Sequence, residues 1–203
     1  MSTNSNTRRW LALVVVLIAA AVFVGGVVGA QFNVPHGEDF QASLETDVAV
    51  RVAGIPGQDG LPARSVLVQP TSAGFLCLWD APSASAKARQ GGCNPAEDPL
   101  AGRKLTISLA YDGGPAVGDV RDARLIGLAS FDVASVQVLM TNGTRRTIPM
   151  QREAGVASEA GRFRAFGYRF PRSDFKRGIG PTAVIGLSAS GIEIDRLTTG
   201  YGG

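Results

Sequence analysis

"VASVQVLMTNGTRRTIPM", residues 133–150, decides the fold class of this chain. Two β-prone runs, 133–140 and 144–150, flank Thr141-Asn142-Gly143, and an Asn-Gly pair between such runs is the strongest short-range signal of a β-hairpin. The segment therefore predicts two antiparallel strands joined by a tight turn.

The same pattern extends in both directions from this hairpin. Hydrophobic residues make up 45% of the 203 residues and charged residues 18%, which excludes wholesale disorder, and 26 Gly and 11 Pro supply turns. We expect strands at 47–54, 64–69, 74–80, 104–111, 123–130, 133–140, 144–150, 163–170, 182–189 and 192–198. Such spacing predicts an all-β protein, either an antiparallel β-sandwich or two packed small β lobes that divide near residues 112–122. A short helix is expected only at 81–90.

An uncharged apolar segment lies near the N-terminus, at residues 11–30 (LALVVVLIAAAVFVGGVVGA). At about 1.5 Å per residue, a helix of this length spans about 30 Å, the thickness of the hydrocarbon core of a bilayer. Arg8 and Arg9 precede the segment, so the positive-inside rule places residues 1–10 in the cytoplasm. The segment predicts a single-pass transmembrane anchor in the cell membrane, with the rest of the chain outside.

After the apolar segment we expect a stalk at 31–45 and an extracytoplasmic β domain at 46–203. The stalk contains Pro35 and Gly37 and has no sustained hydrophobic period. An alternative stays open for the N-terminal segment, because the small residues at its end match the pattern of a signal-peptidase site. Cleavage after Ala30 would release a secreted domain.

Both cysteines of the chain, Cys77 and Cys93, lie in the part expected to be exported. Outside the cytoplasm paired thiols persist as disulfides, and two cysteines allow one connectivity. A zinc site is a poorer interpretation, since it needs four ligands and the single histidine, His36, lies in the expected stalk. The sequence thus predicts a structural disulfide between Cys77 and Cys93.

Charge is distributed unevenly along the chain. Residues 31–142 carry 8 basic and 12 acidic side chains, net −4, whereas residues 143–203 carry 10 basic and 5 acidic, net +5. Much of this excess lies in 161–178, "GRFRAFGYRFPRSDFKRG", where basic residues are interleaved with aromatic ones. Because basic surfaces attract anionic polymers and lipid headgroups, we expect a candidate anionic contact surface here. Its members are Arg162, Arg164, Arg169, Arg172, Lys176 and Arg177.

The same segment has a plainer interpretation. Phe166, Tyr168 and Phe170 alternate with Gly167 and Arg169, as in a strand that buries one face and is followed by a solvated basic loop. Nucleic acid is not expected as a partner under either interpretation, because an exported protein rarely meets it.

No motif for catalysis or cofactor binding is evident in the sequence. A serine hydrolase needs a base, usually histidine, and His36 lies in the stalk without a nearby GxSxG motif. Asp112, Asp119 and Asp122 offer oxygen ligands for calcium, but their spacing matches no EF-hand loop. Local ion pairing of Asp119 and Asp122 with Arg121 and Arg124 is the plainer interpretation. We therefore expect no catalytic residue, no metal and no cofactor.

The segments "GFLCLW" and "GGC", followed by "RLIGLASFDVASVQVLMTNGTRRTIPM", resemble a diffuse group of uncharacterised exported bacterial β proteins. The resemblance covers residues 74–150 and consists of a Cys-containing hairpin, a strand with a central glycine, a Val-Ala-x-Val-x-Val strand, a Gly turn and a strand ending near proline. These features fall at Cys77, Cys93, Gly127, Val133, Ala134, Val136, Val138, Gly143 and Pro149. Such proteins often have proline in the turn where this chain has Phe131-Asp132. The resemblance implies an exported β fold and no particular activity.

Together these features predict a non-enzymatic accessory or binding module at the cell envelope. One alternative is an exported enzyme that uses Asp and Arg without histidine, and another is a structural subunit of an envelope complex. A strongly perturbed titratable group in a deep pocket would favour the enzyme, whereas exposed arginines beside aromatic rings would favour the binding module.

Overall fold

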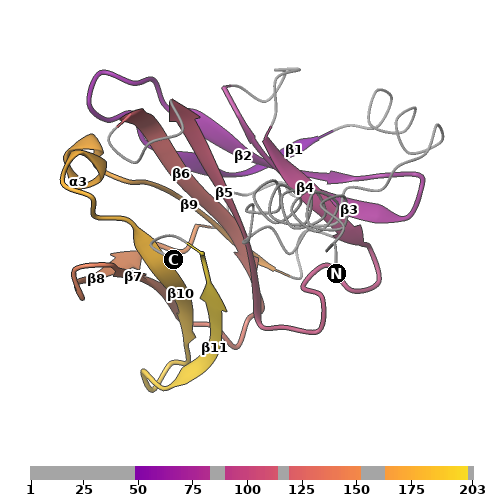
Figure 1. Cartoon of the computed structure of the whole chain (residues 1–203). Helices are drawn as coiled ribbons and strands as arrows, with labels where there is room; N and C mark the ends of the chain where they lie inside the picture. Colours follow the sequence, from indigo (N-terminus) through magenta and orange to yellow (C-terminus); the bar gives the residue numbers. More distant parts are fainter. Residues whose placement is uncertain (1–48, 83–89, 114–118, 152–162, 201–203) are drawn as a thin grey trace, which may run out of the picture.

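The computed structural model describes residues 49–82, 90–113, 119–151 and 163–200 (Figure 1). All strand pairs formed within these ranges are antiparallel, which confirms the prediction of an all-β protein. The expected anchor at 11–30, the stalk at 31–45, Arg162 and most of the expected helix at 81–90 lie outside the described residues. No helix in the described part of the chain is long and apolar enough to cross a membrane.

The described strands form three sheets, and the strands are numbered in the order of the chain. The N-terminal sheet has the order β1-β2-β3-β4 and consists of β1 (Val50–Ile55), β2 (Arg64–Pro70), β3 (Phe75–Ala81) and β4 (Gln90–Pro95). The central sheet has the order β5-β6-β9 and consists of β5 (Leu105–Gly113), β6 (Val120–Ala129) and β9 (Arg164–Arg169). The C-terminal sheet has the order β11-β10-β7-β8 and consists of β7 (Ser135–Met140), β8 (Arg145–Ile148), β10 (Pro181–Leu187) and β11 (Glu193–Thr198). A short helix, α3 (Arg172–Lys176), follows β9.

The central sheet lies between the other two and buries side chains on both of its faces (Figure 1). Successive residues of a strand point to opposite faces, so neighbours on β6 enter different cores. Leu125 packs in the core shared with the C-terminal sheet, together with Val136, whereas Ile126 packs in the core shared with the N-terminal sheet, together with Val66. This double burial explains why the second half of β6, from Leu125 to Ala129, is continuously apolar. The division suggested near 112–122 falls between β5 and β6, which pair with each other.

The predicted Asn-Gly hairpin is present as β7 and β8, with Val138 opposite Arg146. Gly143 has a φ of 79°, a conformation that glycine adopts without steric cost, and its N–H donates to the carbonyl oxygen of Met140. Asn142 accepts hydrogen bonds from the backbone N–H of Thr144 at 3.1 Å and from its hydroxyl at 2.8 Å. The turn chemistry that the sequence predicted therefore sets the register of this hairpin.

The sequence did not predict β4, because Gly91 and Gly92 have little β propensity. The strand forms against β3, where Cys77 lies directly opposite Cys93 and the two are joined by the predicted disulfide. Only glycine fits at position 91, because a Cβ there would collide with the carbonyl oxygen of Leu78 on β3. Close pairing to β3 and the covalent bond thus compensate for the low β propensity of this strand.

A second difference from the sequence-based expectation concerns the segment after β9. The basic loop expected there is a short helix, α3, and it begins directly after Pro171. Pro171 is the N-cap residue, and the N–H that proline lacks is among those that a helix leaves unpaired at its start. Phe175 on the inner side of the helix is 1% exposed, and this burial holds so short a helix in place.

Gly127, in the middle of β6, gives the first prediction. Phe166 on β9 lies directly opposite it, and an added Cβ would collide with the Phe166 ring and lie 2.6 Å from the backbone oxygen of Thr106. Because backbone cannot move aside, Gly127→Ala is expected to lower the free energy of unfolding by about 1–3 kcal/mol in a urea titration. Gly186→Ala is the matched control, since the atoms nearest to its added Cβ belong to the flexible side chains of Leu105 and Val133. Equal losses for both variants would show that the Gly127–Phe166 contact has no special role.

Candidate functional site

The structure divides the predicted basic surface into three environments. Arg164 begins β9, and Arg169 ends the same strand. Arg172, Lys176 and Arg177 lie beyond that strand, on α3 and directly after it. The described members of the predicted surface therefore do not form one continuous patch.

Arg169 is a buried structural residue with 4% of its surface exposed. Its Nε donates to Asp122 Oδ1 at 2.9 Å, and its Nη1 donates to the carbonyl oxygens of Pro56 and Pro62 at 2.8 and 2.9 Å. These bonds fasten the loop between β1 and β2 to the central sheet. The assignment of Arg169 to an exposed contact surface is corrected accordingly.

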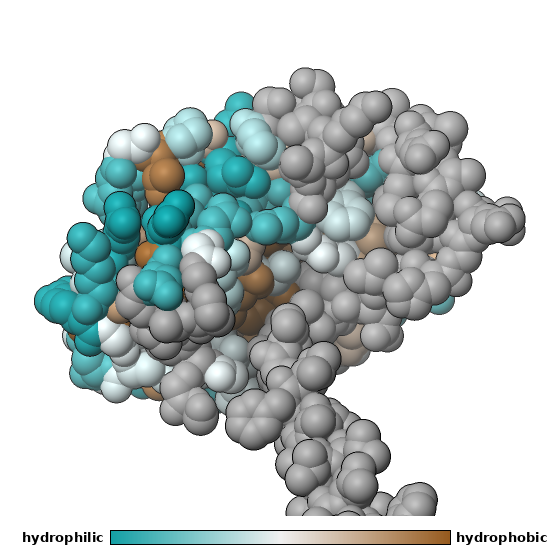
Figure 2. All heavy atoms as spheres, turned by 45° about the horizontal axis from the view of Figure 1, so that its top comes forward, coloured by the Kyte–Doolittle hydropathy of each residue, from teal (hydrophilic) through white to brown (hydrophobic). Residues whose placement is uncertain are grey.

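The residues Arg172, Lys176 and Arg177, which we call the α3 surface, are all exposed. Arg172 and Lys176 are four residues apart, so they lie on the same side of the helix. Among the described residues neither of these two forms an ion pair. Hydrophilic side chains dominate the left of Figure 2, the side on which Figure 1 shows α3.

Asp174, the acidic residue of α3, points inward and is 1% exposed. Its Oδ2 pairs with Arg146 Nη2 at 2.6 Å, and its Oδ1 accepts a hydrogen bond from Arg177 Nη2 at 3.0 Å. Burial by itself would lower the pKa of Arg146, but the hydrogen bond to Tyr168 and the charge of Asp174 outweigh it and raise that pKa. The helix therefore turns its carboxylate to the core and its cations to solvent.

Aromatic rings fill the space beneath the α3 surface. Phe175 makes edge contacts with Phe170 at 5.9 Å and with Tyr111 at 6.1 Å between ring centroids, and Phe170 makes another with Tyr168 at 5.1 Å. Phe166 and Phe170 are buried and Tyr168 is partly buried, as the plainer interpretation of this segment expected, but the face expected to be solvated is buried too, at Gly167 and Arg169. Edge-to-face aromatic contacts add about 0.5–1.5 kcal/mol each beyond area burial, so they hold α3 on a rigid base.

A cluster of charged residues lies between the N-terminal and central sheets. Its centre is Arg124 on β6, whose side chain is 0% exposed. Arg124 Nε pairs with Asp80 of β3, and Arg124 Nη1 pairs with Asp122 and, at 2.7 Å, with Asp112 of β5. On β2, Arg64 pairs with the other oxygen of Asp80 at 2.5 Å. Four strands from two sheets thus meet in this cluster.

Within the cluster, the acidic and basic side chains stabilise each other's charged forms. The hydrogen bond from Arg124 lowers the pKa of Asp112. Burial by itself would lower the pKa of Arg124, but the hydrogen bond to Asp112 and the charges of Asp80 and Asp122 outweigh it and raise that pKa. The predicted pairing of Asp122 with Arg124 is confirmed. Asp112 and Asp122 therefore serve as ion-pair partners of Arg124. Because Asp80 belongs to the N-terminal sheet and Arg124 to the central sheet, the cluster joins these two sheets.

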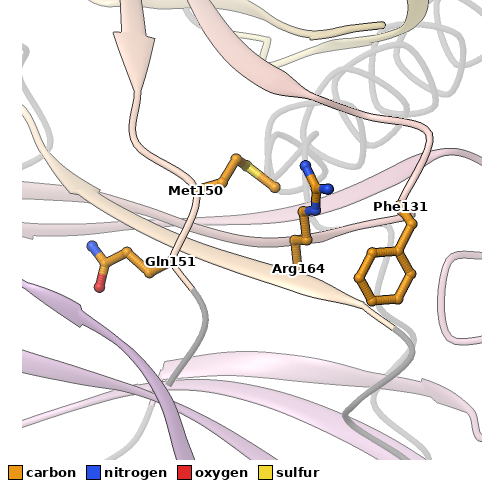
Figure 3. Close-up of a pocket in the computed structure, with 4 residues that line it drawn as sticks. All are labelled: Phe131, Met150, Gln151 and Arg164. Carbon is orange, nitrogen blue, oxygen red and sulfur yellow. The ribbon is translucent and has the colours of Figure 1, made fainter. Parts of the chain in front are cut away.

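A pocket of about 230 Å³ lies at the other end of β9 (Figure 3). Phe131, Met150, Gln151 and Arg164 line it. Figure 3 shows Met150 extending toward the guanidinium end of Arg164, with Phe131 beside it and Gln151 turned away. Gln151 accepts from the N–H of Gly54 at 2.9 Å and donates to its carbonyl oxygen at 3.0 Å. Sequence reasoning found Arg164 but not its neighbours, since these come from separate loops and strands.

Comparisons of the chain with protein-family models, with curated proteins and with solved structures found no significant match. Its function is therefore argued from the geometry of the α3 surface, the charged cluster and the pocket.

Proposed function

We propose that this chain is a non-enzymatic extracytoplasmic all-β module that is held to the cell membrane by residues 11–30 and binds an anionic envelope polymer through the α3 surface. One observation carries the proposal: Arg172 and Lys176 face solvent without an ion pair among the described residues, while Asp174 is turned into the core. The carboxylate of Asp59 accepts a hydrogen bond from the backbone N–H of Arg172 at 3.0 Å, so the guanidinium of Arg172 and the ammonium of Lys176 stay available to an extended polyanion.

The position of α3 favours a polymer over lipid headgroups as the partner. In Figure 1 the chain enters β1 at the right of the molecule, and α3 lies at the left. A domain tethered through the chain that precedes β1 presents the far side away from its anchor. The α3 surface then points away from the bilayer, toward polymers of the envelope.

The charged cluster and the pocket support a binding module over an exported enzyme. Asp112, whose pKa is lowered, is bound to Arg124, so the pair is an ion pair and not a poised acid or base. The four residues described as lining the pocket include Arg164 and no carboxylate or nucleophile. Electrostatic binding requires neither.

The double variant R172Q/K176Q tests the proposal. A cation near an anionic surface contributes about 1 kcal/mol, so removing two is expected to weaken binding about 30-fold at low ionic strength. The measurement is titration of the full-length protein, in neutral detergent, with fluorescently labelled polyphosphate as the anionic probe. Binding by the unaltered protein should also weaken as salt is raised, because salt screens exposed charges.

The matched control is K104Q/R196Q, which removes the same charge elsewhere on the surface. Lys104 is exposed and pairs with Asp132, and Arg196 is exposed and pairs with Glu193. This control is expected to bind the probe as the unaltered protein does. Equal weakening by both double variants would mean attraction by net charge alone and would contradict a specific site. Binding to phosphatidylglycerol vesicles without binding to polyphosphate would instead assign the surface to lipid headgroups.

A further inference from the structure

The pocket at Arg164 is separate from the α3 surface, and it has its own chemistry. We propose that it binds a small carboxylate with an apolar tail, through Arg164, which lies between Met150 and Phe131 in Figure 3. This inference goes beyond the proposed function and does not depend on it, because the two sites share no residue.

Arg164 is held in place from two directions. Its Nη1 donates to the carbonyl oxygen of Val133 at 3.2 Å, and its guanidinium carbon lies 5.6 Å from the centre of the Phe131 ring. The planar guanidinium has five N–H donors in a fixed fork, so one bond to Val133 leaves donors for a carboxylate. A cation that is already positioned loses less freedom when the ligand binds.

The other residues of the pocket determine the rest of the ligand. Gln151 uses both polar atoms of its amide on the backbone of Gly54. Met150 offers a flexible thioether that adapts to apolar groups, and Phe131, which is 45% exposed, offers a ring. Since one cation is combined with apolar walls and no acidic side chain among the four lining residues, a monoanion with an apolar tail fits better than a cation or a multiply charged anion.

The volume of the pocket limits the size of the ligand. Pockets for drug-sized ligands have volumes of roughly 300–1,000 Å³, so a pocket of about 230 Å³ suits a smaller ligand. A ligand of about ten non-hydrogen atoms, such as phenylacetate, fits this space. Ligands of this size with one charged contact bind at about millimolar Kd.

The test compares phenylacetate with phenylacetamide, a neutral molecule of the same shape, by saturation-transfer NMR on the full-length protein in detergent. Phenylacetate is expected to bind at about 1 mM Kd, and phenylacetamide at least about tenfold more weakly. In R164Q the preference for the carboxylate should disappear. In R164K it should be reduced but not lost, because lysine keeps the charge without the planar fork.

Two controls keep the outcome decisive. The variant R172Q/K176Q leaves the pocket intact and should bind phenylacetate as the unaltered protein does. Thermal unfolding of R164Q shows whether the fold is retained, and R164K provides a second, milder change. Equal binding of the acid and the amide, or an unchanged preference in R164Q, would overturn the proposal. Neither result would affect polyphosphate binding at the α3 surface, so the two proposals fail separately.

Discussion

Replacing Arg124 with methionine is expected to lower the free energy of unfolding by about 3–5 kcal/mol, the cost of removing one partner from a buried ion pair. Asp80 and Asp122 are 0% and 8% exposed at their side chains, so without Arg124 their carboxylates lose a charged partner in a place that water hardly reaches. Methionine has a similar length and is flexible, so packing changes little. Urea unfolding of the full-length protein in neutral detergent, followed by circular dichroism, measures the loss.

A second variant separates the charge effect from a failure to fold. In R124M/D80N the carboxylate of Asp80, which keeps only Arg64 as a charged partner in R124M, is also removed, and about 1 kcal/mol or more of the lost stability is expected to return. The control R196Q breaks the exposed pair with Glu193 and should cost less than about 1 kcal/mol. If the free energy of unfolding of R124M lies within about 1 kcal/mol of that of the unaltered protein, the cluster does not hold the two sheets together.

The pH of this measurement follows from the direction of the pKa shift at Asp112. Folding lowers that pKa, so the group adds stability above its unfolded pKa of about 4 and loses it as the pH falls through the lower folded value. At pH 7 the group is ionised in both states. The loss in R124M at pH 7 therefore contains no contribution from the protonation of Asp112.

Strands were predictable from sequence where local pattern alone defines them. The β-prone runs at 133–140 and 123–130 and the turn at Asn142-Gly143 each carry their signal within ten residues, and each lies in a strand or turn at nearly the expected position. The short helix α3 carried no such signal, since its apolar anchor, Phe175, is a single residue. Strand β4 carried a misleading signal, because its glycines serve close packing against β3.

The charged cluster could be predicted only in part, because it depends on contacts between distant segments. Asp122 and Arg124 are two residues apart, and their pairing was expected. Asp80 is 44 residues from Arg124 and on another sheet, so no sequence window contains both. The same limit explains Arg169, which looks like a solvated strand residue until its partners, the carbonyl oxygens of Pro56 and Pro62, are brought to it by folding.

Replacing both cysteines with alanine is expected to lower the free energy of unfolding by about 3 kcal/mol. Cys77 and Cys93 are separated by 16 positions, and the bond restricts the unfolded chain by closing this loop. In the folded protein both residues are 0% exposed, in a buried cluster that includes Trp79 and Leu67. The effect is measured by urea unfolding of C77A/C93A and of the unaltered protein, the latter both with and without a reducing agent.

The loss of stability is expected to be concentrated in β4, because this strand has the weakest β propensity in the N-terminal sheet. Without the covalent bond, amide hydrogen exchange in Gln90–Pro95 is expected to accelerate much more than in Ser135–Met140, where the Asn-Gly turn holds the register. The reduced unaltered protein is the control, because it keeps both sulfur atoms and loses only the bond. If reduction leaves stability and exchange unchanged while C77A/C93A is destabilised, packing of the sulfur atoms is responsible and the bond is not. If both treatments open β4 first, the bond is what allows two glycines to serve as a strand.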